Sequence, residues 1–157
     1  MVISIFYIAI VILVIAFVSI KKRLHLFEIL FLWMALMYIE QNFATIVNLN
    51  LKMVQIPERL DIYWFTATSR LLWNPLLIIW YVELCFTMHR TLLFRGMLAL
   101  LLILLLVSRE LAAEHFALFQ YTGWKPWLSG VAYASNILIA VLLYKWFHRM
   151  IGKERIR

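Results

Sequence analysis

Polar and ionisable side chains lie inside the hydrophobic segments of this chain, where a membrane helix is normally apolar. They are Glu40, Asn74, Arg109 and Glu110. A charged side chain at the centre of a bilayer costs about 2.5–3.5 kcal/mol on insertion scales. Such residues persist where they pair with one another or face a water-filled cavity. They are therefore candidates for ligand binding or for proton transfer.

These residues lie at a similar predicted depth. A helix rises about 1.5 Å per residue, so depth can be counted along each segment from its basic end. Counted in this way, all of them lie about 21–23 Å from that end. Three separate segments are thus predicted to place polar groups in one layer, in the outer half of the bilayer.

Charge and spacing suggest how this polar layer is organised. Glu40 and Arg109 are predicted to form an ion pair, because each would offset the desolvation of the other. Glu110 and Glu114 are four residues apart, so they share one face of their helix.

The third and fifth segments add further groups to the layer. Arg70 and Asn74 are four residues apart, with Arg70 nearer the outer surface. Pro75 removes an intrahelical hydrogen bond and leaves a backbone carbonyl free near the same depth. The polar residues of the fifth segment that come near the layer are Ser129, Tyr133 and, deeper, Asn136.

The second segment also carries a polar stripe. Its members follow helical spacing and are Tyr38, Gln41, Asn42, Thr45 and Asn48. Amides that face lipid are costly, so this face is predicted to contact protein or water.

The candidate polar layer comprises Glu40, Gln41, Arg70, Asn74, Arg109, Glu110 and Glu114. Three interpretations are open. The groups are a static network that specifies helix packing, a ligand or proton site open to the outer face, or an interface completed by another chain or a second copy.

Known catalytic and metal-binding motifs are absent from the sequence. The series Glu110, Glu114 and His115 does not have the HExxH or HxxEH spacing of zinc proteases. There is no P-loop, GxGxxG motif or nucleophile elbow, and we expect no metal and no cofactor. Glu28 and Glu83 both lie near the cytoplasmic ends of their segments, where they either pair with the basic residues there or accept protons.

The composition is that of a helical membrane protein. Of the 157 residues, 66% are hydrophobic, against roughly 45–50% in soluble domains. We predict one all-α domain over residues 1–157 with five transmembrane helices. The predicted spans are about 2–20, 24–46 with a polar tail through 50, 69–88, the stretch after Arg95 to His115, and 127–144. The single cysteine, Cys85, excludes an internal disulfide.

The distribution of Lys and Arg predicts the topology. With the N-terminus outside and the C-terminus in the cytoplasm, ten of them lie on the cytoplasmic side and five on the outer side. The first span is preceded by no basic residues, so we expect it to be uncleaved. The net charge of +7 is explained by these flanking residues. We therefore expect the lipid bilayer, and no nucleic acid, as a partner.

Two stretches are predicted to lie on the outer side. Residues 51–68 mix charged and apolar side chains, which indicates an amphipathic segment at the interface. Residues 116–127 are rich in aromatic side chains, and Trp and Tyr prefer the headgroup level. The second stretch is predicted to form an interfacial belt, to cap a pocket from outside, or to do both.

Three features carry a resemblance to a known group of proteins. They are Asn74-Pro75 in the third span, the acidic residue Glu110, and the stretch QYTGWKPW at 120–127. In their order the chain resembles a family of small, uncharacterised multi-pass membrane proteins from endospore-forming Firmicutes, over roughly residues 40–150. The chain departs from that family before the third span. The resemblance implies a bacterial plasma membrane, and no catalytic residue, because the family has no established activity.

The leading functional hypothesis is a non-enzymatic integral membrane protein, either alone or as an accessory subunit of a larger assembly. Its polar layer would bind a small ligand, a lipid headgroup or a partner helix. One alternative is a small proton-coupled transporter that uses Glu40 and Glu83 at different depths. Another is a membrane-embedded hydrolase built on Glu110, Glu114 and His115.

Overall fold

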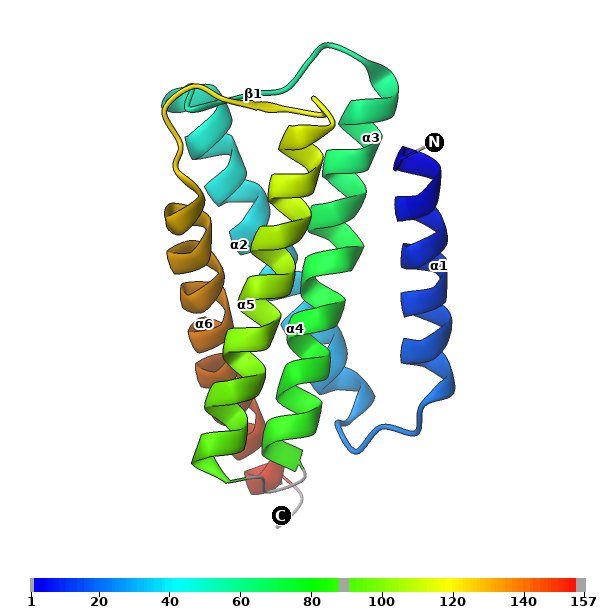
Figure 1. Cartoon of the computed structure of the whole chain (residues 1–157). Helices are drawn as coiled ribbons and strands as arrows, with labels where there is room; N and C mark the ends of the chain where they lie inside the picture. The colour runs from blue at the N-terminus through cyan, green and yellow to red at the C-terminus, as the bar shows by residue number, and fades with distance from the viewer. Residues whose placement is uncertain (1, 88–90, 155–157) are drawn as a thin grey trace.

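The computed structural model of the protein describes residues 2–87 and 91–154. In this part the chain forms five helical rods that run alongside one another (Figure 1). The rods are α1 (Val2–Ser19); α2 (Leu26–Thr45) continued by the π-helical η1 (Ile46–Asn50); α3 (Leu60–Thr68), η2 (Ser69–Trp73), α4 (Asn74–Val82) and η3 (Glu83–Thr87) in series; α5 (Leu92–His115); and α6 (Pro126–Glu154). The start of α1 and the end of α6 lie at opposite ends of the bundle.

Three of the described helices are long and apolar enough to cross a membrane. They are Leu26–Asn50, Leu92–His115 and Pro126–Ile151, while the apolar stretch Ile3–Ser19 in α1 is shorter. The helical prediction is therefore confirmed, and these three helices fit a membrane protein by length and composition. The predicted end of the third span at Met88, with His89 and Arg90 after it, lies outside the described residues.

The third rod begins earlier than the sequence predicts. Its helix starts at Leu60 instead of Ser69, because Ile62 and Phe65 are buried against the rest of the bundle. Residues 60–68 therefore belong to this rod and do not form a separate interfacial segment. The fourth rod likewise begins at Leu92, where the Thr91 side chain accepts a hydrogen bond from the Phe94 backbone N–H and caps the helix.

The main core lies between α2, the third rod, α5 and α6. Fully buried aliphatic side chains from all four rods meet there, among them Leu36, Ile79, Leu106 and Ala140. On α2 the buried residues recur every four positions and are Glu28, Leu32, Leu36, Glu40 and Ala44. The same helix face therefore carries the core leucines and two carboxylates.

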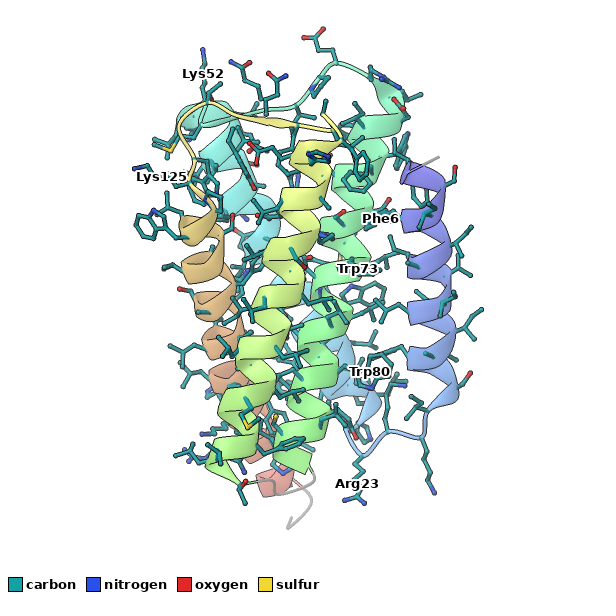
Figure 2. All side chains as sticks on the ribbon, in the orientation of Figure 1. Phe6, Arg23, Lys52, Trp73, Trp80 and Lys125 are labelled. Carbon is teal, nitrogen blue, oxygen red and sulfur yellow. The ribbon has the colours of Figure 1, made fainter. Side chains whose placement is uncertain are left out.

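Helix α1 packs mainly on the third rod through a second apolar cluster. Phe6 lies against Phe65 and Trp73, with ring centroids 4.4 and 5.4 Å apart (Figure 2). Ile10 is also buried in this cluster. This packing leaves most of the outward face of α1 exposed.

Two loops at one end of the bundle are joined by a short ladder. Strand β1 (Val54–Gln55) pairs antiparallel with β2 (Gln120–Tyr121), so that Val54 faces Tyr121. The Thr122 backbone N–H and the Thr122 hydroxyl donate to the carbonyls of Met53 and Lys52. We call this end of the molecule the strand end; Lys52 and Lys125 lie there, and Arg23 lies at the opposite end (Figure 2). The all-α prediction is thus correct for the rods and misses this ladder.

Candidate functional site: a polar cavity at the strand end

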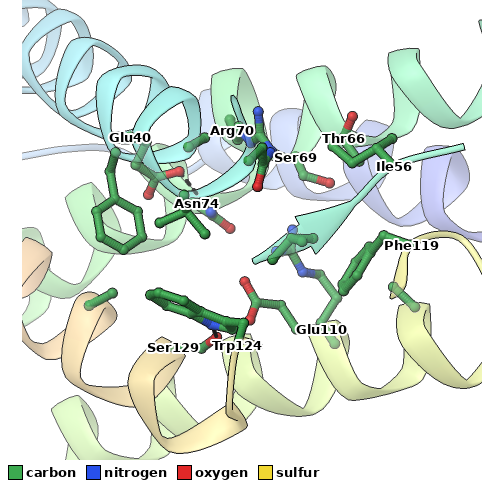
Figure 3. A pocket seen from close by; sticks show the side chains of 18 of the residues that line it. Glu40, Ile56, Thr66, Ser69, Arg70, Asn74, Glu110, Phe119, Trp124 and Ser129 are labelled. Carbon is green, nitrogen blue, oxygen red and sulfur yellow. Dashed lines mark hydrogen bonds between the residues drawn. The ribbon is translucent and has the colours of Figure 1, made fainter. Parts of the chain in front are cut away.

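A cavity of about 120 Å³ lies between the rods beneath the β1–β2 ladder (Figure 3). Its polar lining consists of Glu40, Asn48, Thr66, Ser69, Arg70, Asn74, Arg109, Glu110, Tyr121, Trp124, Ser129, Tyr133 and Asn136. These residues come from every rod except α1. For comparison, an apolar cavity of about 150 Å³ binds benzene. This cavity has the size for a small molecule or a headgroup, and its lining is polar.

The Glu40 carboxylate joins three rods in the cavity wall. Glu40 is 5% exposed and accepts a hydrogen bond from Asn74 Nδ2 at 2.7 Å. Asn136 Nδ2 approaches its second carboxylate oxygen at 3.5 Å. Two neutral amides, from α4 and α6, thus donate hydrogen bonds to the buried carboxylate of α2. The Asn74 Oδ1 atom is buried and has no hydrogen-bond partner within the described residues.

The Glu110 carboxylate is held by two tyrosines on the opposite wall. Tyr133 of α6 donates its hydroxyl to Glu110 Oε1, and Tyr121 of β2 donates to Glu110 Oε2 at 3.1 Å. Burial and the adjacent Glu110 raise the pKa of the Tyr121 phenol well above its ordinary value. The phenol therefore remains a hydrogen-bond donor at physiological pH.

The two arginines of the cavity make fewer hydrogen bonds than the two carboxylates do. Arg109 Nη2 donates to the Tyr133 hydroxyl at 3.4 Å, while Arg109 Nη1 is buried without a partner. Arg70 makes no hydrogen bond or ion pair with any other residue in 2–87 and 91–154. Free donor capacity in the cavity is therefore concentrated on the guanidinium groups.

The predicted Glu40–Arg109 ion pair is absent from the described part of the chain. Within 4.0 Å the described residues contain the ion pair Arg59–Asp61 and the contact His148–Glu28, which is ionic only when the imidazole is protonated. Glu40 instead receives its hydrogen bonds from two amides, and Arg109 donates to Tyr133. The two predicted partners still line the same cavity, so their charges act across it and not by direct contact.

A π-helical segment and a proline shape the third rod beside the cavity. In η2 the Asn74 backbone N–H reaches the Ser69 carbonyl, five residues back, which widens the helix where Arg70 lies. Pro75 cannot donate to the Leu71 carbonyl, which accepts a hydrogen bond from Trp33 Nε1 at 2.7 Å. The carbonyl predicted to be free is thus used to attach α2 to the third rod.

Aromatic and apolar residues of the two loops complete the cavity. Val54, Ile56, Phe119 and Tyr121 line it beneath the ladder. Trp124 also lines it, and its Nε1 donates to Ser129 Oγ at 2.8 Å. By contrast, Trp127 is 63% exposed. The aromatic stretch therefore divides between a cap over the cavity and outward-facing rings suited to a membrane interface.

Five of the seven predicted site residues line the cavity: Glu40, Arg70, Asn74, Arg109 and Glu110. Gln41 and Glu114 do not. Gln41 is exposed on the far face of α2. Most of its polar stripe also faces away from the bundle: the Asn42 amide and the Thr45 hydroxyl donate to carbonyls of their own helix. This face is predicted to contact protein or water; in the described part of the chain it is mostly exposed, while Asn48 lines the cavity.

The sequence signals for the remaining lining residues differ in strength. Ser129, Tyr133 and Asn136 follow helical spacing on α6, and that periodicity brings them to the layer as expected. The roles of Tyr121 and Trp124 depend on how the loops fold back, for which no periodic signal exists. Composition indicated an interfacial position for both residues. It could not predict that Tyr121 donates a hydrogen bond to Glu110 or that Trp124 donates one to Ser129.

Two further buried carboxylates lie at the opposite end of the bundle. Glu83 accepts hydrogen bonds from the backbone N–H groups of Arg23 and Leu24, at 2.7 and 3.0 Å. Glu28 caps its own helix through the His25 N–H and lies 2.6 Å from His148 Nδ1. These contacts anchor the 20–25 loop and the end of α6 to the bundle.

The described residues contain no group of three or more His, Cys, Asp or Glu side chains arranged to hold a metal. Glu110 lines the cavity, whereas neither Glu114 nor His115 does. The series proposed for a hydrolase is therefore not assembled around one space.

No protein-family model, no curated protein and no solved structure matches this chain. The resemblance to small membrane proteins of endospore-forming Firmicutes therefore stays a prediction, and function has to be argued from the cavity.

Proposed function

We propose that this chain is a multi-pass protein of the bacterial plasma membrane with five spans. Three helices have the length and hydropathy to cross a bilayer. α1 and the third rod run alongside them for a comparable distance (Figure 1). The excess of basic residues near the end that carries Arg23 supports a cytoplasmic position for that end. The strand end then faces outward, with the N-terminus.

We propose that the cavity at the strand end is a binding site and that the protein is not an enzyme. The observation that carries this proposal is a polar cavity in which Arg109 Nη1 and Asn74 Oδ1 are buried without partners. Leaving a buried polar group unpaired costs about 1–3 kcal/mol. A bound group that pairs with both atoms would recover that energy. The candidate occupants are a small soluble ligand, a lipid headgroup and a polar group of a partner helix.

The proposal is tested by removing charges from the cavity lining. Glu40→Gln and Arg109→Gln, alone and together, should alter both thermal unfolding in detergent and the set of molecules retained in native mass spectrometry. Glu58→Gln and Lys125→Gln are matched controls, because both side chains are exposed in the loops of the strand end.

The unfolding temperature and the retained molecules of the double variant decide whether the proposal is overturned. If the double variant unfolds at the wild-type temperature and retains the same molecules, the cavity has neither a binding role nor a structural one. If it unfolds earlier but retains the same molecules, the polar groups serve packing alone.

A further inference from the structure

We infer that the cavity binds an oxyanion, either a carboxylate or a phosphate group, and that Arg70 and Arg109 are the residues that bind it. This inference rests on the proposed binding function of the same cavity, and it assigns the chemical class of the ligand.

The carboxylate oxygens of the cavity already accept hydrogen bonds, whereas Asn74 Oδ1 has no partner within the described residues. Each carboxylate receives two donors from the protein: Glu40 from Asn74 and Asn136, and Glu110 from Tyr121 and Tyr133. A cationic ligand would have to share these oxygen atoms with the donors already bound to them. The arrangement therefore does not favour a ligand that is only a cation.

The guanidinium donors of the cavity are largely unused. A guanidinium group has five N–H donors. Arg109 uses one of its nitrogens in a 3.4 Å contact, and its Nη1 has no partner within the described residues. Arg70 has no hydrogen bond there at all. The planar fork of arginine matches carboxylate and phosphate oxygens, often with two parallel hydrogen bonds.

The volume of the cavity and the charge of its lining restrict the kinds of ligand that can bind. A volume of about 120 Å³ is well below the roughly 300–1,000 Å³ of drug-sized pockets, so only a group of a few heavy atoms enters. The two arginines and two glutamates carry balanced formal charge. A ligand that has its own cationic group, as zwitterions and some lipid headgroups do, preserves this balance when its oxyanion binds.

The first experiment uses full-length protein purified in detergent, with thermal unfolding as the readout. Sodium phosphate and sodium acetate are titrated against sodium chloride at matched ionic strength, and ethylammonium chloride is the cationic probe. We expect saturable stabilisation by phosphate and acetate and none by ethylammonium. Arg70→Gln and Arg109→Gln should each weaken the apparent affinity about tenfold or more, because each removes charge-assisted hydrogen bonds to the oxyanion.

Matched controls separate the cavity from general charge effects. Arg59→Gln and Lys125→Gln remove exposed basic residues from the same end of the molecule and should leave the affinity unchanged. If either glutamine variant of the cavity does not fold, Arg70→Lys and Arg109→Lys keep the charge but lose the fork. These lysine variants should still lose several-fold in affinity.

A second arm identifies the source of the oxyanion. Dihexanoyl phosphatidylethanolamine is titrated alongside glycine and inorganic phosphate. Stabilisation by the short-chain lipid at lower concentrations than the soluble probes require assigns a lipid headgroup, and equal or stronger stabilisation by the soluble probes assigns a free anion. Both results support the inference, provided that the Arg70 and Arg109 variants lose the effect.

Failure of this inference can be distinguished from failure of the proposed function. If ethylammonium stabilises the protein and the arginine variants bind as the wild type does, the ligand is a cation; the binding site then stands and the oxyanion assignment falls. If no probe stabilises the protein and native mass spectrometry finds no retained molecule, both fall.

Discussion

Asn74 on α4 donates a hydrogen bond to Glu40 on α2, with 2.7 Å between Asn74 Nδ2 and Glu40 Oε2 (Figure 3). Both side chains are at least nine-tenths buried. The contact connects the second and third rods at the depth of the cavity, and it leaves the other atom of the amide, Oδ1, without a partner. One residue thus both supports the wall of the cavity and contributes an open acceptor to it.

Asn74→Ala should destabilise the protein by about 1–3 kcal/mol, because it leaves a buried carboxylate with a single weak hydrogen bond. Ordinary interhelical hydrogen bonds in membranes average only about 0.6 kcal/mol. The measurement is thermal or denaturant unfolding in detergent. Asn42→Ala is the control, since that amide is exposed and binds its own helix. If both variants lose the same unfolding free energy, the hydrogen bond to Glu40 contributes no more to stability than an exposed amide does.

Tyr133→Phe should also destabilise the protein by about 1–3 kcal/mol. The change removes a hydroxyl that donates to Glu110 and accepts from Arg109, and it leaves the ring in place. Tyr38→Phe removes a hydroxyl from a tyrosine that is 72% exposed and should change stability by less than about 0.5 kcal/mol. Unfolding free energies of the two variants, measured side by side, check this prediction. A Tyr133 variant as stable as wild type would contradict the assigned network.

Stability should fall in alkali because of Tyr121. Burial and Glu110 raise the pKa of this phenol in the folded state above its unfolded value of about 10. The unfolded state therefore ionises first. The stabilising contribution is fully present below about pH 10 and is lost as pH rises toward the folded pKa. For one group the loss reaches at most about 1.36 kcal/mol per pH unit.

The check is unfolding free energy against pH, with phenolate absorbance followed in parallel. Tyr121→Phe should flatten the alkaline decline, and Tyr63→Phe, a change at an exposed tyrosine, should not. An identical decline in wild type and the Tyr121 variant would place the titrating group elsewhere.

Ala117→Gly should stabilise the protein by about 0.5–1 kcal/mol. Ala117 follows α5 with φ 54°, a left-handed conformation that glycine adopts without steric cost. The Ala117 and Leu118 N–H groups bond back to the carbonyls of Glu114 and Ala113, which is the Schellman arrangement that usually contains glycine.

Ala112→Gly is the opposite test on the same helix. Ala112 lies in the last part of α5 and is exposed, so glycine there should destabilise by about 0.5–1 kcal/mol. Thermal unfolding of both variants gives the comparison. Destabilisation by both changes would mean that the turn after α5 does not require the left-handed conformation.

The positions of the site residues along the rods could be predicted from the sequence. Glu40, Asn74 and Glu110 lie in hydrophobic segments that form helices, and all three line one cavity. Depth is predictable because the helical rise per residue is nearly constant. The start of the third rod was harder to predict from the sequence, because the residues from Leu60 to Thr68 mix polar and apolar types.

Which side chains meet was not predictable in the same way. Glu40 and Arg109 lie at similar depth with opposite charge, yet Glu40 is bonded by Asn74 and Asn136. Partner choice depends on the rotation of each helix about its axis, which is set by how the buried leucines of neighbouring rods pack. Gln41, next to Glu40 in the sequence, therefore faces outward.

The sequence by itself determined that polar groups lie at one height inside apolar helices, because periodicity and helical rise are local properties of the chain. The tertiary structure alone decided that Tyr121 and Trp124 close this layer into a cavity and that Arg70 and Arg109 have donors to spare. Those outcomes depend on packing between rods and on the pairing of two distant loops, and no local pattern encodes either.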